Sequence, residues 1–300
     1  MSLVVEAVNL VKAYGATRAL DGLNLEVQPG QVHGFLGPNG SGKSTTLKVL
    51  LGLARSDSGT VKVFGGDPWA DSVELHRRLA YVPGEVSLWP NLSGGEIINL
   101  MCALRSGVDK KRLDDLIERF HLDVTRKART YSKGNRQKVA LVAALAADVE
   151  LLLLDEPTAG LDPLMESEFR LCISEARERG QTVLLSSHIL SEVEATCDQV
   201  TIIRGGKAVE SGRLSELSHL GQHTLRAELL GPASENIASM AGVSEVVADA
   251  NMLTCSYEPG ALNELLQEVA RIGVVSLQTR PPTLEELFLR HYMEPESGGR

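Results

Sequence analysis

Short apolar runs, each about the length of a buried strand, recur through the first two thirds of the chain: residues 31–37, 79–82, 151–154, 182–186 and 199–204. The runs at 151–154 and 182–186 are of the kind that parallel sheets bury on both faces. Residues 3–10 instead alternate apolar and polar side chains, which predicts a strand with one exposed face. Residues 43–53 and 164–179 show helical periodicity between the runs. The pattern therefore predicts an α/β core.

A segment with a different period interrupts this core between about residues 86 and 147. Apolar residues are spaced by three and four over residues 96–105, 110–120 and 134–147. That spacing predicts three amphipathic helices. We therefore expect a helical insertion between two strands of the core.

The pattern changes again after residue 217. Strand-like segments lie at 223–230, 245–248, 252–257 and 274–278, and helix-like segments lie at 234–240, 261–272 and 284–292. This order predicts a small α+β appendage, ferredoxin-like in arrangement, with a core of its own. We predict a first domain over residues 1–216, a second over 217–293, and a disordered tail over 294–300.

Composition excludes some classes of protein. The chain is 43% hydrophobic and 23% charged, as expected for a globular protein, and its net charge of −9 argues against general binding of nucleic acid. The four cysteines lie far apart, without a CxxC pair, which predicts buried thiols in a reducing compartment.

The chain shows neither a secretory signal nor a membrane-spanning pattern. Its first ten residues lack a basic segment followed by an apolar stretch. The longest apolar region, residues 139–154, is broken by Asp148 and Glu150 and is shorter than the roughly 20 residues that a spanning helix needs. We expect a soluble chain that reaches a membrane only through a partner.

A glycine-rich sequence joins the run at 31–37 to the helix at 43–53. It fits the pattern GxxxxGK[ST] and consists of Gly37, Pro38, Asn39, Gly40, Ser41, Gly42, Lys43, Ser44 and Thr45. Glycines let backbone N–H groups converge on phosphate oxygens, and the helix N-terminus adds partial positive charge. We predict that Lys43 reaches the β- and γ-phosphates of ATP and that Ser44 is a ligand of Mg²⁺. A glycine-rich turn that matches by chance is the alternative.

Two carboxylates follow the apolar run at 151–154. The run would deliver Asp155 to the carboxyl edge of the sheet, where open α/β sheets bind their ligands. We predict that Asp155 holds Mg²⁺ through water and that Glu156 polarises the attacking water as a general base. Alone, this string would fit any strand that ends in a loop; the phosphate-binding loop makes the catalytic interpretation the better one.

From about residue 4 to residue 214 the chain resembles the nucleotide-binding subunit of an ABC (ATP-binding cassette) transporter. Ahead of the run at 151–154 lies a string similar to the signature loop of that family: Ser132, Lys133, Gly134, Asn135, Arg136 and Gln137. The resemblance implies that this loop caps the γ-phosphate bound to a second copy in a head-to-tail dimer. Independently, Ser132 and a helix N-terminus would offer donors to an anion.

Three further positions carry roles that the resemblance implies. Asp162, in the string Ala-Gly-Leu-Asp, resembles the D-loop residue that communicates across the dimer. His188 resembles the switch histidine that contacts the γ-phosphate and orients Glu156, although a Ser-His pair alone is more often structural. Tyr14 matches the aromatic residue that stacks on adenine, and packing is the alternative for a lone tyrosine.

The resemblance also implies the fold: a P-loop NTPase (RecA-like) core, an antiparallel β subdomain and the inserted helices, followed by the appendage. The string Leu92-Ser93-Gly94-Gly95-Glu96 looks like a second signature loop, but it lies too far upstream. We interpret Ser93 as a helix N-cap and Glu96 as the partner that completes a capping box.

One position departs from the family pattern. After the strand at 79–82 the family has a glutamine that touches Mg²⁺ and the attacking water, whereas this chain has Gly84. Glycine offers no side chain for either contact. We hypothesise that Glu85 or a bound water substitutes, or that hydrolysis is slow without the membrane partner.

The string Pro-Thr-Leu-Glu-Glu-Leu-Phe at residues 282–288 resembles the close of ATPases that drive bacterial antibiotic and multidrug exporters, or is simply a threonine-capped amphipathic helix. We predict an ATPase that exports a drug, antibiotic or lipid-like substrate. Its expected partners are a separate transmembrane permease and a second copy of the chain, at the inner face of the cell membrane. A permease-free ABC ATPase acting on ribosomes or DNA, and another P-loop class, are the alternatives.

Overall fold

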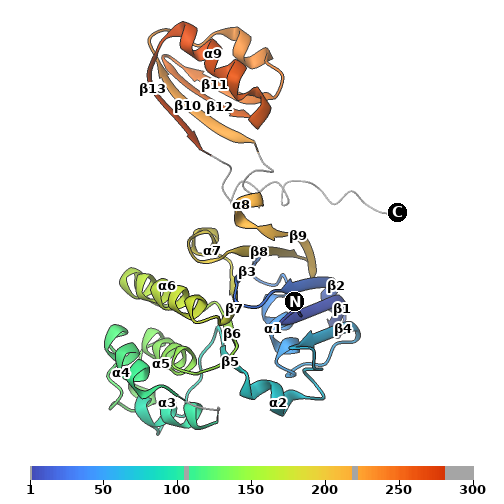
Figure 1. Cartoon of the computed structure of the whole chain (residues 1–300), viewed down its shortest axis with the longest axis vertical. Helices are drawn as coiled ribbons and strands as arrows, with labels where there is room; N and C mark the ends of the chain where they lie inside the picture. Colours follow the sequence, from blue (N-terminus) through green and yellow to red (C-terminus); the bar gives the residue numbers. More distant parts are fainter. Residues whose placement is uncertain (1, 105–107, 218–221, 281–300) are drawn as a thin grey trace. The chain divides into compact units, whose positions relative to one another are not determined.

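The computed structural model describes residues 2–104, 108–217 and 222–280, in two compact units: residues 1–212, and residues from Arg213 onward (Figure 1). The predicted boundary between residues 216 and 217 lies at the end of α8 (Leu214–Leu217), just inside the second unit. The predicted helix at 284–292 and the tail at 294–300 lie outside the described residues.

The first unit contains the predicted strands and helices in the predicted order, together with further elements that were not predicted individually, among them those at residues 17–27, 58–63, 72–77, 190–196 and 207–213. Its elements are β1 (Val5–Tyr14), β2 (Thr17–Val27), β3 (Val32–Leu36), α1 (Lys43–Leu50), β4 (Ser58–Val63), α2 (Ser72–Arg77), β5 (Leu79–Val82), α3 (Gly94–Ala103), α4 (Lys110–Arg119), the 3₁₀-helix η1 (Ala128–Thr130), α5 (Lys133–Leu145), β6 (Leu151–Asp155), α6 (Pro163–Glu178), β7 (Thr182–Ser187), α7 (Leu190–Thr196), β8 (Gln199–Arg204) and β9 (Lys207–Arg213).

A six-stranded sheet forms the centre of this unit, in the order β5-β6-β7-β3-β8-β9. The pairs from β5 to β8 are parallel. Successive side chains of a strand face opposite sides, and in β6 both faces are apolar. Leu152 and Leu154 pack into the cluster beneath the helices, whereas Leu151 and Leu153 pack into the cluster on the other face.

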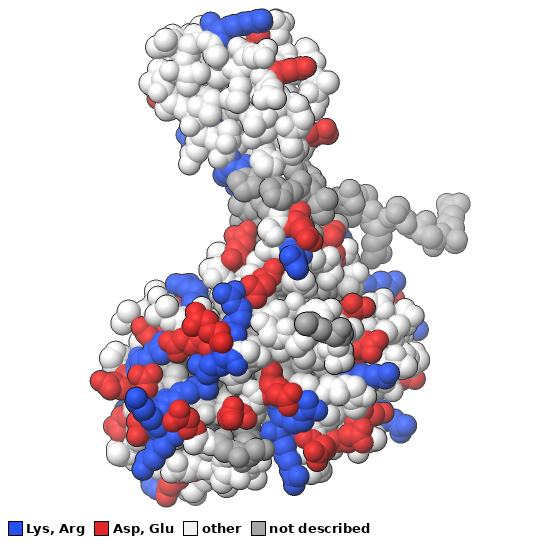
Figure 2. All heavy atoms as spheres, viewed as in Figure 1, with Lys and Arg blue, Asp and Glu red and all other residues white. Residues whose placement is uncertain are grey.

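The two faces of the sheet are covered by different layers (Figure 1). One face packs against α3, α4, α5 and α6, the predicted helical insertion and the helix that follows β6. The other packs against α1 and a three-stranded antiparallel sheet in the order β2-β1-β4. Figure 2 shows acidic and basic side chains interspersed over the visible face of this unit.

The strand order brings the functional loops together. β3 and β7 are neighbours, with Leu36 paired to Ser187, and β6 and β7 are neighbours, with Asp155 paired to Ser186. The loops that leave the carboxyl ends of these three strands therefore meet at one edge of the sheet, as is usual for ligand sites in open α/β sheets.

The second unit has its own sheet and core. After α8 it contains β10 (His223–Leu229), the 3₁₀-helix η2 (Glu235–Ser239), β11 (Val243–Asp249), β12 (Met252–Tyr257), the 3₁₀-helix η3 (Pro259–Ala261), α9 (Leu262–Ile272) and β13 (Val274–Arg280). The antiparallel order β11-β12-β10-β13 is the ferredoxin-like arrangement, with η2 where a longer helix would stand. Leu225, Leu253, Tyr257, Leu265 and Val269 are buried in this core.

Candidate nucleotide-binding and catalytic site

The glycine-rich loop joins β3 to α1. Gly40 and Gly42 have φ angles of 81° and 115°, in the left-handed region that side chains with a Cβ rarely adopt. A Cβ on Gly42 would also lie 2.7 Å from the carbonyl oxygen of Ala19. The Gly37 N–H donates to the Ser187 carbonyl at 3.2 Å, which ties the start of the loop to β7.

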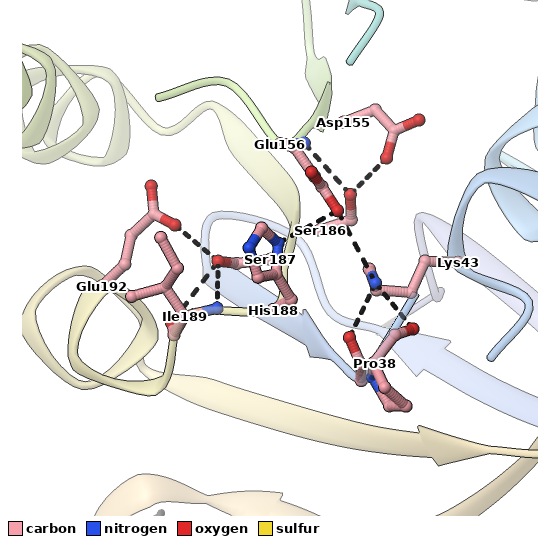
Figure 3. A network of polar contacts seen from close by, with 10 residues as sticks. Pro38, Lys43, Asp155, Glu156, Ser186, Ser187, His188, Ile189 and Glu192 are labelled. Carbon is pink, nitrogen blue, oxygen red and sulfur yellow. Dashed lines mark hydrogen bonds and ion pairs between the residues drawn. The ribbon is translucent and has the colours of Figure 1, made fainter. Parts of the chain in front are cut away.

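Lys43 turns back into this loop. Its ammonium donates to the carbonyl oxygens of Gly37 at 2.7 Å and Pro38 at 3.1 Å (Figure 3). Burial lowers the pKa of Lys43, and the nearby carboxylates of Glu156 and Asp155 oppose that shift. The buried hydroxyl of Ser41 has no hydrogen-bond partner among the described residues. A buried cation and an orphaned hydroxyl in a glycine loop fit the oxygens of a phosphate chain.

Asp155 ends β6, and its carboxylate is bonded from the neighbouring strand. Ser186 Oγ donates to Asp155 Oδ1 at 2.5 Å and accepts from the Glu156 N–H at 3.2 Å. Sequence analysis did not single out Ser186, because its partner lies on another strand and no motif marks it.

Glu156 and His188 face each other across the end of the sheet. His188 Nδ1 lies 3.2 Å from Glu156 Oε1, and Lys43 Nζ lies 3.7 Å from the same oxygen (Figure 3). Glu156 has a φ angle of 44°, which a side chain with a Cβ adopts at a cost. Lys43 begins α1, Glu156 follows β6 and His188 follows β7, so this convergence is a product of the fold.

The loop at Ser132–Gln137 opens α5 and is tied to the segment that follows Glu156. Ser132 is exposed and caps the helix, accepting from the Asn135 N–H at 3.2 Å. A Cβ on Gly134 would lie 2.6 Å from the Gly160 carbonyl oxygen, and Gln137 Nε2 donates to the Pro157 carbonyl at 2.9 Å.

The remaining residues of that loop and the D-loop position have local partners. Arg136 donates to the Tyr131 carbonyl at 2.8 Å, and Lys133 is exposed. Asp162 caps α6 by accepting from the Met165 N–H at 3.0 Å. A helix cap is compatible with the predicted D-loop role of Asp162 because one carboxylate oxygen accepts that bond.

Tyr14 lies at the end of β1 and is half exposed, with the Lys12 ammonium 5.3 Å from its ring centroid. The ring is therefore not part of the core. Exposure of this kind leaves a face available for stacking on a base.

Gly84 lies against Asp155. A Cβ on Gly84 would be 3.3 Å from the Asp155 carbonyl oxygen and 3.7 Å from its carboxylate. Glu85 instead lines a surface cavity of about 610 Å³ together with Arg129, Lys133 and Arg136. Gly84, the position where the family has a glutamine, thus lies next to the Asp155 carboxylate, while Glu85 lines a groove with three basic side chains.

The capping-box interpretation of Ser93 and Glu96 is confirmed. Ser93 Oγ accepts from the Glu96 N–H at 3.2 Å, and Glu96 Oε2 accepts from the Ser93 N–H at 2.6 Å, at the start of α3. Of the four cysteines, Cys102, Cys172 and Cys255 are buried, and all four are free thiols. No helix in the described ranges is long and apolar enough to cross a membrane.

Comparison with known proteins identifies a family for each of the two units. A family model described as ABC transporter matches residues 20–159, and one described as the C-terminal domain of DrrA1-3-like ATP-binding proteins matches residues 212–292. The linearmycin resistance ATP-binding protein LnrL of Bacillus subtilis is 32% identical, over 95% of this chain and 97% of its own length.

A second relative and a solved structure agree. The bacitracin transport ATP-binding protein BcrA of Bacillus licheniformis is 34% identical, over 97% of each chain. A solved ATP-binding subunit of an ABC transporter superposes with a TM-score of 0.67 at 28% identity, covering 73% of this chain and 93% of that one.

Proposed function

The chain belongs to the ABC transporter family as an ATP-binding protein and ATPase, and we propose that it powers export through a separate membrane-spanning permease. The match of both units to ATP-binding proteins of linearmycin resistance and bacitracin transport, over nearly their whole length, supports this proposal. The convergence of Lys43 and His188 on one oxygen of Glu156 supports the ATP hydrolysis that would power this export.

We propose that Glu156 accepts a proton from the attacking water while His188 holds its carboxylate in place. Lys43 would leave its loop carbonyls to bind the β- and γ-phosphates of ATP, because a cation prefers phosphate oxygens to neutral carbonyls. Tyr14 would stack on the adenine.

Mg²⁺ is the expected cofactor, and the residues near the glycine-rich loop fit it. The described ranges contain no group of three or more His, Cys, Asp or Glu side chains that could hold a metal, but a Mg²⁺ site does not need one. Mg²⁺ commonly uses few protein oxygens besides phosphates and water, and Ser44 and Asp155 would supply them here. When bound, the ion would neutralise charge that develops on the phosphates.

We propose that two copies of the chain complete each nucleotide site. Ser132 is exposed at the N-terminus of α5, where its hydroxyl and the first N–H groups of the helix can donate to an anion. In a head-to-tail pair this loop would meet the γ-phosphate held by Lys43 of the other copy, with Asp162 near the seam.

The groove at Glu85 supports a permease contact. Arg129, Lys133 and Arg136 line it, and Trp89 is 53% exposed in the same connecting segment, which is the mixture of aromatic and arginine side chains common at interfaces. The permease would hold the chain at the inner face of the membrane. The named relatives act in linearmycin resistance and bacitracin transport, so we propose an antibiotic, drug or lipid-like cargo.

Co-purification tests the proposal. The chain is expressed with a membrane-spanning permease from the same genome, extracted from membranes, and assayed for ATP hydrolysis with candidate drugs. We expect a stable complex whose hydrolysis is stimulated by its cargo and is lost in Lys43→Ala, whereas Lys48→Ala, an exposed lysine of the same helix, stays active. Hydrolysis by a chain that associates with no permease would contradict the export role.

A further inference from the structure

A short turn encloses His188. The Ile189 N–H donates to Ser187 Oγ at 2.9 Å, so the side chain of one neighbour is bonded to the backbone of the other. Serine turns of this kind restrain the backbone of the residue between the two bonded groups. The backbone of His188 is therefore held by the Ser187 hydroxyl.

Glu192 fixes the direction of that hydroxyl. Ser187 Oγ donates to Glu192 Oε2 at 2.5 Å, while the competing acceptor, the Ile189 carbonyl, lies at 3.4 Å (Figure 3). A hydroxyl has one proton, so donation to Glu192 leaves the oxygen lone pairs for the Ile189 N–H. The carboxylate thus stabilises the turn without touching His188.

Glu192 lies on a rigid support. It occupies the first turn of α7, and α7 approaches β3 so closely that a Cβ on Gly34 would lie 2.6 Å from a methyl carbon of Val193. Close packing of this kind leaves the helix little freedom to shift. The position of the Glu192 carboxylate is therefore set by the central sheet.

The burial of Glu192 is costly for a purely structural residue. Its side chain is only 9% exposed, and Oε1 has no partner within the described residues. Glu192 borders a small cavity of about 120 Å³ together with Thr158, Glu166 and Arg170. A buried carboxylate with one bonded oxygen destabilises a fold relative to an apolar residue, and such violations concentrate at functional sites.

We propose that Glu192 is a positioning residue, which acts through Ser187 to hold His188 at hydrogen-bond distance from Glu156. This role rests on the proposed ATPase function of Glu156 and His188. Without Glu192 the Ser187 side chain loses the acceptor that fixes its rotamer, so its oxygen can turn away from the Ile189 N–H. The turn then opens, and the imidazole samples orientations that do not meet Glu156.

Kinetics of variants test the role. In Glu192→Ala we expect kcat to fall about tenfold, the scale of a lost hydrogen bond to a charged group, with the affinity for ATP unchanged. Glu192→Gln retains an acceptor for Ser187 and should recover most of the rate. Glu194→Ala, an exposed glutamate of the same helix, is the control. Equal losses in kcat and ATP affinity, or no rescue by glutamine, would overturn the proposal.

The partner residue provides a second variant. Ser187→Ala should lower kcat to the same extent, and the double variant with Glu192→Ala should be no slower than either single one, because both remove one interaction. Additive losses would show that the two side chains act separately. If Glu192→Ala folds poorly, Ser187→Ala alone still tests the proposal.

A spectroscopic measurement separates this role from the ATPase function. In nucleotide-free protein labelled at histidine, the His188 ring signal should shift or broaden in Glu192→Ala and Ser187→Ala but stay unchanged in Glu194→Ala. An unchanged signal in both variants would sink the positioning role even if hydrolysis is confirmed. Altered signals in a chain that fails to hydrolyse ATP would instead count against the proposed function.

Discussion

Among single residues, Glu156 combines an unfavourable backbone conformation with contacts to two other residues of the site. Its φ of 44° costs on the order of 1 kcal/mol or more, and its carboxylate meets both Lys43 and His188. Ser186 offsets part of that cost by accepting from the Glu156 N–H. The residue to which we assign proton abstraction therefore has a strained backbone.

Replacement of that carboxylate separates binding from chemistry. Glu156→Gln keeps the size of the side chain but removes the base, so we expect hydrolysis to fall about 10²- to 10⁴-fold while ATP binding persists. The variant should then accumulate as an ATP-bound dimer in size-exclusion chromatography. Glu178→Gln, an exposed glutamate on α6, should behave like the wild type. A variant that stays monomeric with ATP would contradict the two-copy site.

His33 makes folding sensitive to acid. It is fully buried on β3, bonded through Nε2 to Thr201 Oγ at 2.9 Å, and burial lowers its pKa to about 4. The unfolded chain takes up the proton near pH 6.5, before the folded chain does. The stability that depends on neutral His33 is therefore complete above pH 6.5 and is lost progressively as the pH falls toward 4.

The expected loss is about 2 kcal/mol between pH 6.5 and pH 5, at 1.36 kcal/mol per pH unit. Urea unfolding at a series of pH values measures it. His33→Gln should remove this part of the pH dependence, and His121→Asn, which replaces an exposed histidine, should keep it. Parallel pH profiles for wild type and His33→Gln would contradict the assignment.

At the level of elements, two helices begin with a serine cap but serve different ends. Ser93 and Glu96 form a closed capping box at α3, whereas Ser132 at α5 accepts a single bond and is exposed. A capping box satisfies its own helix, while the start of α5 retains donors for an anion. Similar strings of residues thus lead to different chemistry.

The two serines can be distinguished by measurement. Ser93→Ala should lower the free energy of unfolding by about 1 kcal/mol without changing ATP hydrolysis. Ser132→Ala should cost a similar amount of stability and also weaken ATP-driven dimerisation and hydrolysis. The two variants are therefore matched controls for each other. Lost dimerisation in Ser93→Ala alone would mean that the loop at 92–96 is the true signature loop.

The elements that the sequence predicted share a strong period. The parallel strands β3, β5, β6, β7 and β8 are short, mostly apolar runs, and the helices of the insertion show a regular spacing of apolar residues. β2 and β4 were not predicted individually, because β2 carries polar residues and glycine among its leucines and β4 is mostly exposed. Their place in a sheet depends on pairing with β1, which no local pattern records.

The site likewise contains residues that the sequence indicates and residues that only the fold reveals. Lys43, Asp155 and Glu156 belong to strings whose spacing alone indicates phosphate and metal chemistry. Ser186 bonds a residue 31 positions away, and Glu192 contacts the turn around His188 from α7 through a bond to Ser187. Such residues become visible only when strand order and side-chain direction are known.

At the scale of the whole molecule, two separate cores predict two independent folding units. The core of the second unit consists of residues from β10, β12, α9 and η2, all within one contiguous stretch of sequence. A contiguous stretch with its own core can fold alone. Removal of either unit should therefore leave the other with its secondary structure intact.

Expression of residues 213–300 tests that independence. We expect a single cooperative thermal transition, followed by circular dichroism. Leu265→Ala, which truncates a fully buried side chain, should lower the free energy of unfolding by about 2–5 kcal/mol. Leu230→Ala, at a side chain that is 72% exposed, should have little effect. Gradual melting of the isolated segment would show that it depends on the rest of the chain.

The close approach of Gly134 to Gly160 bears on the order in which the two nucleotide sites of the proposed pair would hydrolyse ATP. The loop that would serve a neighbour's nucleotide rests on the segment that follows this chain's own Glu156, with Gln137 bonded to Pro157. A rearrangement after cleavage in one copy would thus travel along its own backbone to the opposite nucleotide. Two copies linked this way would hydrolyse their nucleotides in a correlated sequence, and neither would hydrolyse ATP independently of the other.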